Sequence, residues 1–372
     1  MVGGGPGAFI GPVHRMAAEL DRDIELVAGA FSRDPQKNRA AGEMWGLAAE
    51  RVYDDWRTMI AAEAARPDGA ELIAVVTPNH LHLPVAKAAL EAGLHVLSDK
   101  PATATLAEAL ELREAVAASG RLFGLTYTYT GYPMVREARA IVARGELGPL
   151  RKVVVEYSQG WLADPIERAD DAKQAAWRTN PQKAGLGGCI GDIGVHAFNI
   201  AEFVSGARVE RLSAQLSRIV PGRALDDDCN VLLRFESGAP GVLITSQVAA
   251  GDRNGLRLRI YGERGGLDWS HERPDRLTLN WLDRPSQTLH AGAPYLSPAS
   301  LRGTRLPTGH PEGFIEAFAN IYRDFAAAIV AGAAAADGVP DALEGLRGMA
   351  FIECAVQSSL KDGAWTNLSE FS

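Results

Sequence analysis

The sequence predicts an N-terminal Rossmann domain, an α/β fold with a doubly wound parallel sheet, followed by an α+β domain whose open sheet is mainly antiparallel. A glycine-dense turn opens the chain, strand and helix patterns alternate through its first third, and strands of alternating polarity follow. The 372 residues, 47% of them hydrophobic, can fill two cores, because single cores stop growing near roughly 250 to 300 residues. We expect domains at residues 1–124 and 125–372.

Repeated strand and helix units predict the first domain. Residues 72–76, Leu-Ile-Ala-Val-Val, are apolar on both faces, as buried parallel strands require. Other strands are expected at residues 24–31 and 95–98, with helices near residues 14–20, 34–44, 84–92 and 105–118. Units of this length predict right-handed crossovers and a ligand site at the carboxyl ends of the strands.

The glycine turn stands where a dinucleotide site requires one. Gly3, Gly5 and Gly7 lead to Ala8 in the form G-x-G-x-x-A, and the next helix supplies amides and a positive dipole end. We expect the three glycines, Phe9 and Ile10 to bind the cofactor; a flexible glycine-rich terminus is the alternative. Only two residues precede the turn, so either the first strand is short or the natural start lies upstream.

The end of the second expected strand bears on the choice of cofactor. An acid there binds the ribose of NAD, whereas a basic residue accommodates the 2′-phosphate of NADP. Ser32 and Arg33 at this position favour NADP. Asp34 reads as a helix N-cap before Pro35, but a register shift of one residue would restore an acid for NAD.

Two loops follow the next strands of the predicted sheet. Residues 77–82 (Thr-Pro-Asn-His-Leu-His) and residues 98–101 (Ser-Asp-Lys-Pro) edge one crevice. Lys100, before a proline, is held extended and can hydrogen-bond a substrate oxygen, unless it is an ordinary exposed cation. His80 and His82 lack the partners of a metal site and are interpreted as turn and wall residues. The cofactor contacts expected here are Thr77, Pro78, Asn79, His82 and Lys100.

Asp192 and His196 stand four residues apart in the run Gly-Gly-Cys-Ile-Gly-Asp-Ile-Gly-Val-His, residues 187–196. On a helix this spacing places both side chains on one face, where an acid and an imidazole could share a substrate and move a proton. The alternative is an N-capping aspartate beside a packed histidine. This segment alone does not decide between the two.

Charge and cysteine content exclude several classes. The net charge of −8 argues against nucleic-acid or anionic-membrane partners. Cys189, Cys229 and Cys354 are far apart in sequence and support neither a disulfide framework nor a zinc cluster. No apolar run is long enough to span a membrane, and no secretory leader is recognisable, so a cytoplasmic protein is expected. Residues 226–228, three aspartates, are interpreted as a solvated turn rather than a calcium loop.

Four motifs in this order resemble the glucose-fructose oxidoreductase, inositol dehydrogenase and rhizopine-catabolism (Gfo/Idh/MocA) family. They are the glycine turn, the loop at residues 77–82, a Glu-Lys-Pro motif present as Asp99-Lys100-Pro101, and the segment 187–196. The resemblance covers most of the chain. It implies a catalytic set of Lys100, Asp192 and His196, in which His196 accepts the proton, Asp192 binds or polarises the substrate and Lys100 holds the reacting oxygen. Asp99 departs from the usual Glu, and Asn199 stands where many members have Asp.

The rest of the chain fits the second domain of that family. Strands are expected at residues 151–157, 230–235, 242–249 and 256–261, with helices near residues 311–330 and 341–360 that pack back on the first domain. The open sheet face implies a homodimer or homotetramer. Tyr132 is a further candidate at the start of this domain, and the tyrosines and His310 could equally be packing or capping residues. Expected substrate contacts are Tyr127, Tyr129, Trp177, Arg178, Asp192, Asn199 and His310.

These features predict an NAD(P)-dependent dehydrogenase, with no metal, acting on a secondary hydroxyl of a sugar, sugar derivative or cyclitol. A neutral histidine supported by an acid and a lysine suits proton removal near pH 7. One alternative is a reductase of a keto sugar or an imine-like dipyrrole. Another is a non-catalytic dinucleotide sensor or regulator.

Overall fold

The computed structural model describes residues 1–5, 7–169 and 173–371. The chain divides into two compact units, Met1–Gly131 with Phe314–Leu346, and Tyr132–Gly313 with Arg347–Ser372. The second segment of each unit comes from the C-terminal part of the chain, so each unit is discontinuous in sequence. The expected boundary between residues 124 and 125 stays a prediction.

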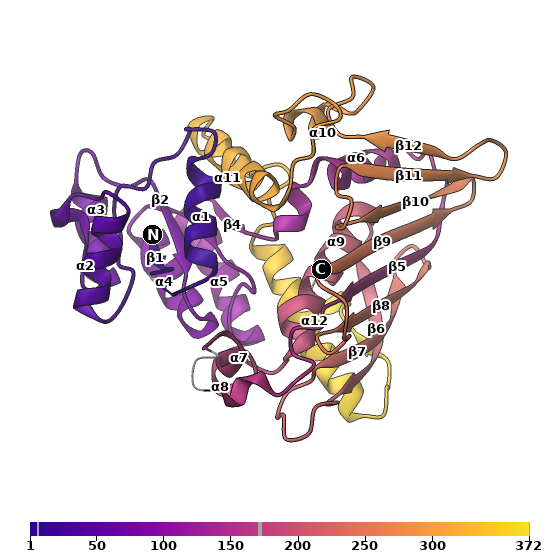
Figure 1. The fold of residues 1–372 in the computed structure, drawn as a ribbon, viewed down its shortest axis with the longest axis horizontal. Helices are drawn as coiled ribbons and strands as arrows, with labels where there is room; N and C mark the ends of the chain where they lie inside the picture. Colours follow the sequence, from indigo (N-terminus) through magenta and orange to yellow (C-terminus); the bar gives the residue numbers. More distant parts are fainter. Residues whose placement is uncertain (6, 170–172, 372) are drawn as a thin grey trace. The chain divides into compact units, whose positions relative to one another are not determined.

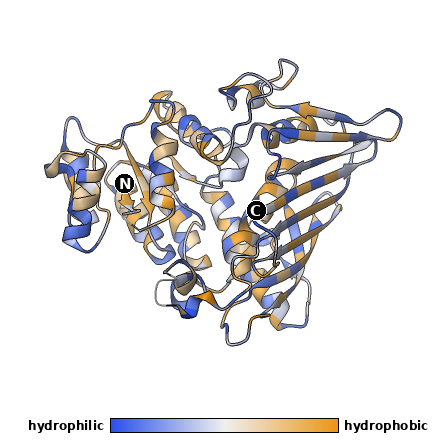
Figure 2. Cartoon of the chain, in the orientation of Figure 1, coloured by the Kyte–Doolittle hydropathy of each residue, from blue (hydrophilic) through white to orange (hydrophobic). Residues whose placement is uncertain are grey.

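The first unit contains a parallel four-stranded sheet in the order β1-β2-β3-β4. Its central strands are buried on both faces, as Val75, Val96 and Leu97 show, and Figure 2 draws this sheet largely in the colours of apolar residues. The elements are β1 (Val2–Gly3), β2 (Leu72–Val76), β3 (His95–Ser98), β4 (Phe123–Leu125), α1 (Ile10–Glu19), α2 (Pro35–Met44), α3 (Trp56–Ala65), α4 (His82–Glu91), α5 (Leu106–Ser119) and α11 (Phe314–Val330), with short 3₁₀ helices η1 (Ala49–Arg51), η2 (Asn79–Leu81) and η3 (Thr128–Gly131).

The expected strand at residues 24–31 is wrong for most of its length. Only isolated parallel bridges remain, Val2 to Ala30 and Gly29 to Val52. The backbone N–H of Gly3 donates to the Ala30 carbonyl at 2.9 Å, and that of Ala30 donates to the Met1 carbonyl at 3.1 Å. The physical reason is that β1 has two residues, which leaves too few partners for a longer ladder.

Helix starts in this unit follow their capping residues. Asp34 accepts from the backbone N–H groups of Gln36 and Lys37, and Pro35 is the first helical residue, which confirms the predicted N-cap of α2. Thr105 and Glu108 form a capping box at the start of α5. These local signals explain why both helices begin within one residue of the expected positions.

Helix α11 packs on α1 within the first unit. The Nδ1 atom of His14 lies 2.7 Å from the Tyr322 hydroxyl, and its ring meets the Phe318 ring edge-on at 4.7 Å between centroids. Val13 and Phe325 belong to the same buried apolar cluster. A C-terminal helix therefore completes the core of the N-terminal unit, and a titratable imidazole is enclosed in that core.

The second unit is built on a nine-stranded sheet in the order β12-β11-β10-β9-β5-β8-β7-β6-β13 (Figure 1). Its elements are β5 (Leu150–Ser158), β6 (Val209–Ser217), β7 (Asp228–Phe235), β8 (Pro240–Ser246), β9 (Gly255–Gly262), β10 (Gly265–Ser270), β11 (Arg276–Trp281), β12 (Gln287–His290), β13 (Thr366–Asn367), α6 (Pro133–Ala143), α7 (Lys173–Arg178), α8 (Pro181–Ala184), α9 (Val195–Ser205), α10 (Pro298–Arg302), η4 (Ile166–Arg168) and η6 (Ser369–Phe371). Helix α12 (Ala342–Leu360) begins in the first unit and continues in the second.

The sheet is mixed rather than purely antiparallel. Strands β5 and β8 pair in parallel, and each other printed pairing in this sheet is antiparallel. A parallel neighbour is possible because a long connection, which includes α9, lies between the two strands. The predicted fold class, a Rossmann sheet followed by an open and mainly antiparallel sheet, is confirmed.

One face of the sheet is buried and the other is more exposed. Alternate residues of β7 and β9 are buried, whereas Leu232 and Tyr261, which are 51% and 41% exposed, lie on the open side. On the covered side, Arg347 of α12 donates through Nε to Glu202 of α9 at 2.8 Å, and both are buried. This enclosed ion pair ties the two covering helices together.

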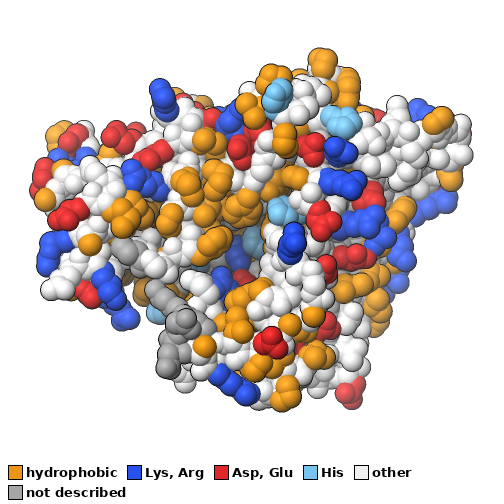
Figure 3. Space-filling model, in the orientation of Figure 1, with side chains coloured by type: hydrophobic (Ala, Val, Ile, Leu, Met, Phe, Trp, Pro, Cys, Tyr) orange, Lys and Arg blue, Asp and Glu red, His pale blue; other side chains and the backbone are white. Residues whose placement is uncertain are grey.

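Basic and acidic side chains are interspersed over the face drawn in Figure 3. Among the described residues, no helix combines the length and apolar character needed to cross a membrane.

The buried His14 predicts a pH dependence of stability. Burial lowers its pKa from 6.5 to about 4. The unfolded chain therefore binds the proton more readily, so stability is present above pH 6.5 and is lost as the pH falls toward 4. We expect the wild type to lose roughly 2 to 3 kcal/mol more than His14→Asn between pH 7 and pH 4.5, measured by urea unfolding at both values. The half-buried His290→Asn serves as the control. An equal loss in wild type and His14→Asn would contradict the prediction.

Candidate active site

The glycine-rich segment forms one turn of π-helix, η5 (Ile190–Gly194), that runs directly into α9. Asp192 lies inside this continuous helical run, and its backbone N–H donates to the Gly188 carbonyl at 2.9 Å. The alternative of an N-capping Asp192 is therefore wrong. Single π-turns within helices recur at functional sites because they re-aim side chains.

The buried carboxylate of Asp226 anchors the start of this turn. Its Oδ1 accepts from the Gly188 N–H and its Oδ2 from the Ile190 N–H, each at 2.7 Å. Gly188 must be glycine, since a Cβ there would lie 2.2 Å from the Asp226 carbonyl oxygen. Burial raises the pKa of Asp226, while the two amides favour its charged form.

The interpretation of residues 226–228 as a solvated turn is wrong. Asp226 and Asp227 are buried. Asp227 accepts from the Ile219 and Val220 N–H groups at 2.6 and 3.0 Å and pairs with Arg223 at 3.1 Å. Both carboxylates are enclosed because they satisfy backbone donors of other segments, which the local sequence does not reveal.

Two side chains hold the carboxylate of Asp192. Arg178 donates through Nε at 3.1 Å and Gln247 through Nε2 at 2.9 Å, both to Oδ2. The Arg178 guanidinium lies 4.3 Å from the Trp177 ring centroid and 5.7 Å from that of Trp161. The structure thus brings the predicted residues Trp177, Arg178 and Asp192 together, with Trp161 and Gln247 as neighbours that sequence reasoning missed.

His196 lies four residues after Asp192 in the same helical run, at the start of α9. It is 9% exposed, and its ring centroid is 6.4 Å from that of Tyr157. The Tyr157 hydroxyl donates to Asn254 Oδ1 at 2.7 Å, and Gln159 Nε2 donates to the same oxygen at 2.8 Å. Asn199, also on α9, is 6% exposed.

Hydrogen bonds link Asn254, the partner of Tyr157, to the candidate residue Tyr132. Asn254 hydrogen-bonds the His271 ring, whose Nε2 lies 3.0 Å from the Tyr132 hydroxyl. Trp161 Nε1 donates to Gln159 Oε1 at 2.9 Å. Gln159, Trp161 and Asn254 carry no motif, so only the pairing of β5 with β9 identifies them.

In the first unit, the glycine turn is a cradle that side chains would obstruct. Gly3, Gly4 and Gly7 have φ values of 82°, 72° and 82°, which favour glycine. A Cβ at Gly5 would meet the Phe31 carbonyl oxygen at 2.7 Å, and one at Gly11 the Gly4 carbonyl oxygen at 1.9 Å. Helix α1 begins at Ile10, and no described side chain caps its N-terminus. The turn can therefore accommodate a phosphate close to backbone amides.

Two further observations in this unit fit a dinucleotide. The hydroxyl of Thr77, just after β2, is buried and has no hydrogen-bond partner among the described residues. At the position expected to contact the ribose or its 2′-phosphate, Ser32 Oγ accepts from the Asp34 N–H at 3.1 Å, and Arg33 is exposed. A polar ligand at these strand ends would satisfy the Thr77 hydroxyl.

His82 ties the two loops beyond β2 and β3 together. Its Nε2 lies 2.8 Å from the Thr77 carbonyl oxygen and its Nδ1 lies 2.7 Å from that of Pro101. The ring is buried, and burial lowers the pKa of His82. Lys100, next to Pro101 in the second of these loops, is half-buried, and its backbone N–H donates to Asp99 Oδ1 at 2.8 Å.

Comparison with known proteins identifies the family. A model described as an oxidoreductase family with an NAD-binding Rossmann fold matches residues 1–127, and the Gfo/Idh/MocA C-terminal domain model matches residues 135–268. The chain belongs to the Gfo/Idh/MocA oxidoreductase family.

Similar proteins align over nearly the whole chain. An uncharacterized oxidoreductase of Bacillus subtilis is 36% identical, over 98% of this chain and 95% of its own. The levoglucosan dehydrogenase of Pseudarthrobacter phenanthrenivorans is 26% identical over 100% of this chain and 98% of its own. An inositol dehydrogenase homolog from Azotobacter vinelandii, complexed with NAD+, has a TM-score of 0.93 and 39% identity, covering 99% of this chain and 96% of that one.

Other residues predicted to contact the substrate of this Gfo/Idh/MocA member are buried or make hydrogen bonds to nearby residues of the chain. Tyr127 and Tyr129 are 1% and 4% exposed, and burial raises the pKa of Tyr127. Exposed His310 hydrogen-bonds the Pro307 carbonyl through Nδ1 at 3.2 Å. Asp99, the departure from the usual Glu, also accepts from the Thr126 hydroxyl at 3.3 Å. The substrate roles of these tyrosines and of His310 stay predictions.

The Asp226 anchor predicts a specific loss of stability. In Asp226→Asn, the side-chain NH2 group replaces one of the two carboxylate oxygens. It would then face a backbone N–H, of Gly188 or Ile190, that donates to that oxygen in the wild type. Hydrogen bonds to charged groups contribute about 1.5 to 3 kcal/mol, so we expect a loss of about 2 kcal/mol in urea unfolding. Asp228→Asn, at the more exposed neighbour, should change stability by less than about 0.5 kcal/mol. Equal losses in the two variants would disprove the anchor.

Proposed function

We propose that this chain oxidises a secondary hydroxyl of an uncharged sugar, sugar derivative or cyclitol with a nicotinamide dinucleotide. The observation that carries the proposal is the helical run in which Asp192, clamped by Arg178 and Gln247, precedes buried His196. Similar structures hold NADH with myo-inositol in the Azotobacter vinelandii homolog, at 38% identity, and NADH with levoglucosan in levoglucosan dehydrogenase, at 26%. These relatives support a polyhydroxylated substrate.

Each proposed catalytic side chain has one task. Bound nicotinamide supplies the acceptor for the hydride. His196 removes the hydroxyl proton, since a neutral imidazole can act as a base near pH 7. Asp192 accepts a hydrogen bond from a substrate hydroxyl, and Lys100 holds the reacting oxygen. Trp177 and Arg178 border the substrate, because both contact Asp192 or its partner.

For the cofactor, we propose NAD(H). The Azotobacter vinelandii homolog complexes contain NAD+ and NADH at 39% and 38% identity. In this chain, the Asp34 carboxylate caps α2 beside Arg33, where its charge disfavours a 2′-phosphate. Ser32 and Arg33 are the basis of the NADP preference expected from the sequence, and binding of NADP is the alternative to this proposal.

The exposed side of the nine-stranded sheet supports self-association as part of the proposal. Leu232 and Tyr261 are exposed there among charged neighbours such as Arg257. An apolar surface rimmed by polar residues is typical of a protein contact. A homodimer or homotetramer would cover this face through a symmetric contact.

Reduction of a keto sugar uses the same groups in reverse. One relative, a dTDP-3,4-didehydro-2,6-dideoxy-alpha-D-glucose 3-reductase of Streptomyces violaceoruber, is 28% identical over 63% of this chain. Oxidation is preferred because the similar complexes with inositol and levoglucosan align over 99% of the chain.

Replacing either proposed proton-handling residue tests the function. We expect His196→Asn and Lys100→Met to lower turnover by roughly a hundredfold or more, measured as nicotinamide reduction with inositols, glucosides and anhydrosugars. Quenching of protein fluorescence by NADH should persist in His196→Asn, and His290→Asn serves as the control. Near-normal turnover in both variants would overturn the assignment. A wild type that binds NADH but turns over none of these substrates would favour a dinucleotide sensor.

A separate measurement tests the cofactor. We expect NADH to bind at least about tenfold more tightly than NADPH, a difference of about 1.4 kcal/mol, in fluorescence titrations at one salt concentration. Tighter binding of NADPH that is lost in Arg33→Ala would instead establish the 2′-phosphate contact and contradict the proposal.

A further inference from the structure

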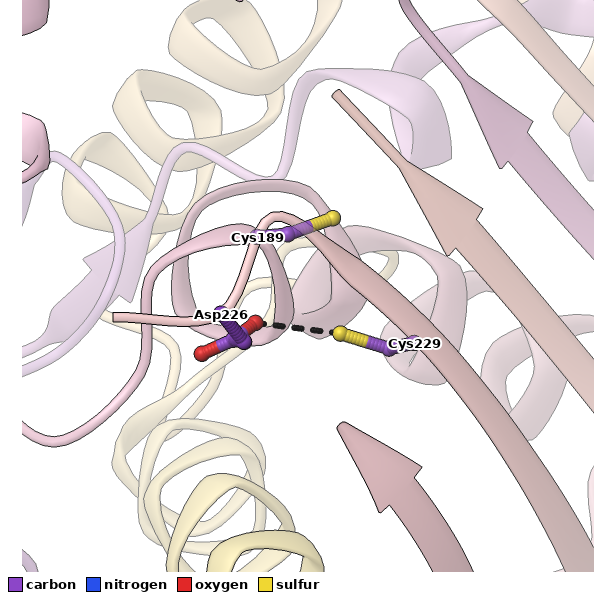
Figure 4. A group of neighbouring side chains, drawn as sticks. All are labelled: Cys189, Asp226 and Cys229. Carbon is purple, nitrogen blue, oxygen red and sulfur yellow. Dashed lines mark hydrogen bonds between the residues drawn. The ribbon is translucent and has the colours of Figure 1, made fainter. Parts of the chain in front are cut away.

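Three potential metal ligands meet behind the π-turn, in the second unit. Cys189 immediately precedes η5, Cys229 lies on β7, and Asp226 lies just before β7. Their ligand atoms lie within 4.8 Å of one another. Figure 4 shows the Cys229 sulfur directed at the Asp226 carboxylate, where it lies 3.0 Å from Oδ2, and Cys189 above these two side chains. The fold thus assembles a pair of cysteines that is widely separated in the sequence.

The donor set and its spacing suit a thiophilic cation. Zinc binds thiolate sulfur at about 2.3 Å and carboxylate oxygen at about 2.0 to 2.2 Å, which places tetrahedral ligand atoms roughly 3.5 Å apart. The Cys229 sulfur lies 3.0 Å from Asp226 Oδ2, and all three ligand atoms lie within 4.8 Å of one another, which is comparable to that value. The group is therefore compact enough for its three ligand atoms to share one ion.

A threonine hydroxyl adjoins the group. Thr245 of β8 is the cross-strand partner of Cys229, and its hydroxyl lies 3.5 Å from the Cys189 sulfur. The two cysteines and Thr245 are fully buried, and Asp226 is 7% exposed. This enclosure resembles a closed structural site rather than an open catalytic one.

Charge and hydrogen bonding permit the exchange of protons for a metal. The Cys229 thiol donates to Asp226 Oδ2, so an ion at that position would use the lone pair that the thiol proton now occupies. Binding a divalent ion releases two thiol protons, and the group keeps a single negative charge. The Gly188 and Ile190 N–H groups can continue to donate to Asp226.

We propose that Cys189, Cys229 and Asp226 bind zinc, and that the ion braces the π-turn that carries Asp192. Its role is structural, because the ligands are enclosed and Asp192 itself is held by Arg178 and Gln247. Binding to the folded state alone stabilises a protein by mass action. The ion would therefore raise the unfolding temperature without entering the hydride-transfer chemistry.

Native mass spectrometry of untagged protein, produced in zinc-supplemented medium, tests the site. We expect about one zinc ion per chain, bound with loss of two protons. Cys189→Ser and Cys229→Ser should lower occupancy at least tenfold, whereas Cys354→Ser, which changes a buried cysteine outside the group, should keep it. Cadmium-grown wild type should show a thiolate-to-cadmium charge-transfer band that Cys354→Ser retains.

The wild-type measurements keep the test decisive even where a serine variant folds poorly. Zinc-free wild type from supplemented medium, together with no thiolate band from cadmium medium, would overturn the proposal. Equal zinc in wild type and a folded Cys189→Ser, Cys229→Ser double variant would also overturn it, because the ion would then lie elsewhere.

Discussion

The buried Asp226 carboxylate is the interaction on which the candidate site of the second unit depends. A helix start leaves backbone N–H groups without partners inside the helix, and here Asp226 accepts from those of Gly188 and Ile190. Removing a carboxylate from water is costly, and these amides together with the Cys229 thiol offset that cost. Because Asp192 follows Ile190 by two residues, the position of Asp192 is fixed by an aspartate from a different segment.

Two aspartates in this region have different environments and therefore different capacities. Asp226 has its oxygens occupied by backbone and thiol donors and is nearly enclosed. The Asp192 side chain is 16% exposed and shares one oxygen between Arg178 and Gln247. Because its side chain is partly exposed, the Asp192 carboxylate is accessible to a hydroxyl donor. Asp226 therefore positions the turn, and Asp192 is the aspartate to which we assign substrate binding in the proposed function.

Features that depend on interactions between residues close in sequence were predicted correctly, and features that depend on distant residues were not. Residues 72–76 and 95–98 are strands at the expected positions, since strands buried on both faces are apolar throughout. Asp34 was identifiable because an N-cap acts within three residues. The strand expected at residues 24–31 was wrong, because its extent depends on the two-residue β1. Asp226, Gln247 and Asn254 were missed because strand pairing brings them to the site.

The arrangement around Asp192 also bears on the proposed substrate class. Arg178 neutralises the charge of Asp192, so the pair presents little net charge to an incoming molecule. Trp177 and Trp161 flank the guanidinium with aromatic faces, which suit the apolar C–H faces of a sugar or cyclitol ring. An anionic substrate would have to compete with Asp192 for Arg178, whereas a neutral polyol can donate to Asp192 and leave the ion pair intact. These features support the proposed preference for uncharged polyols over sugar acids or phosphates.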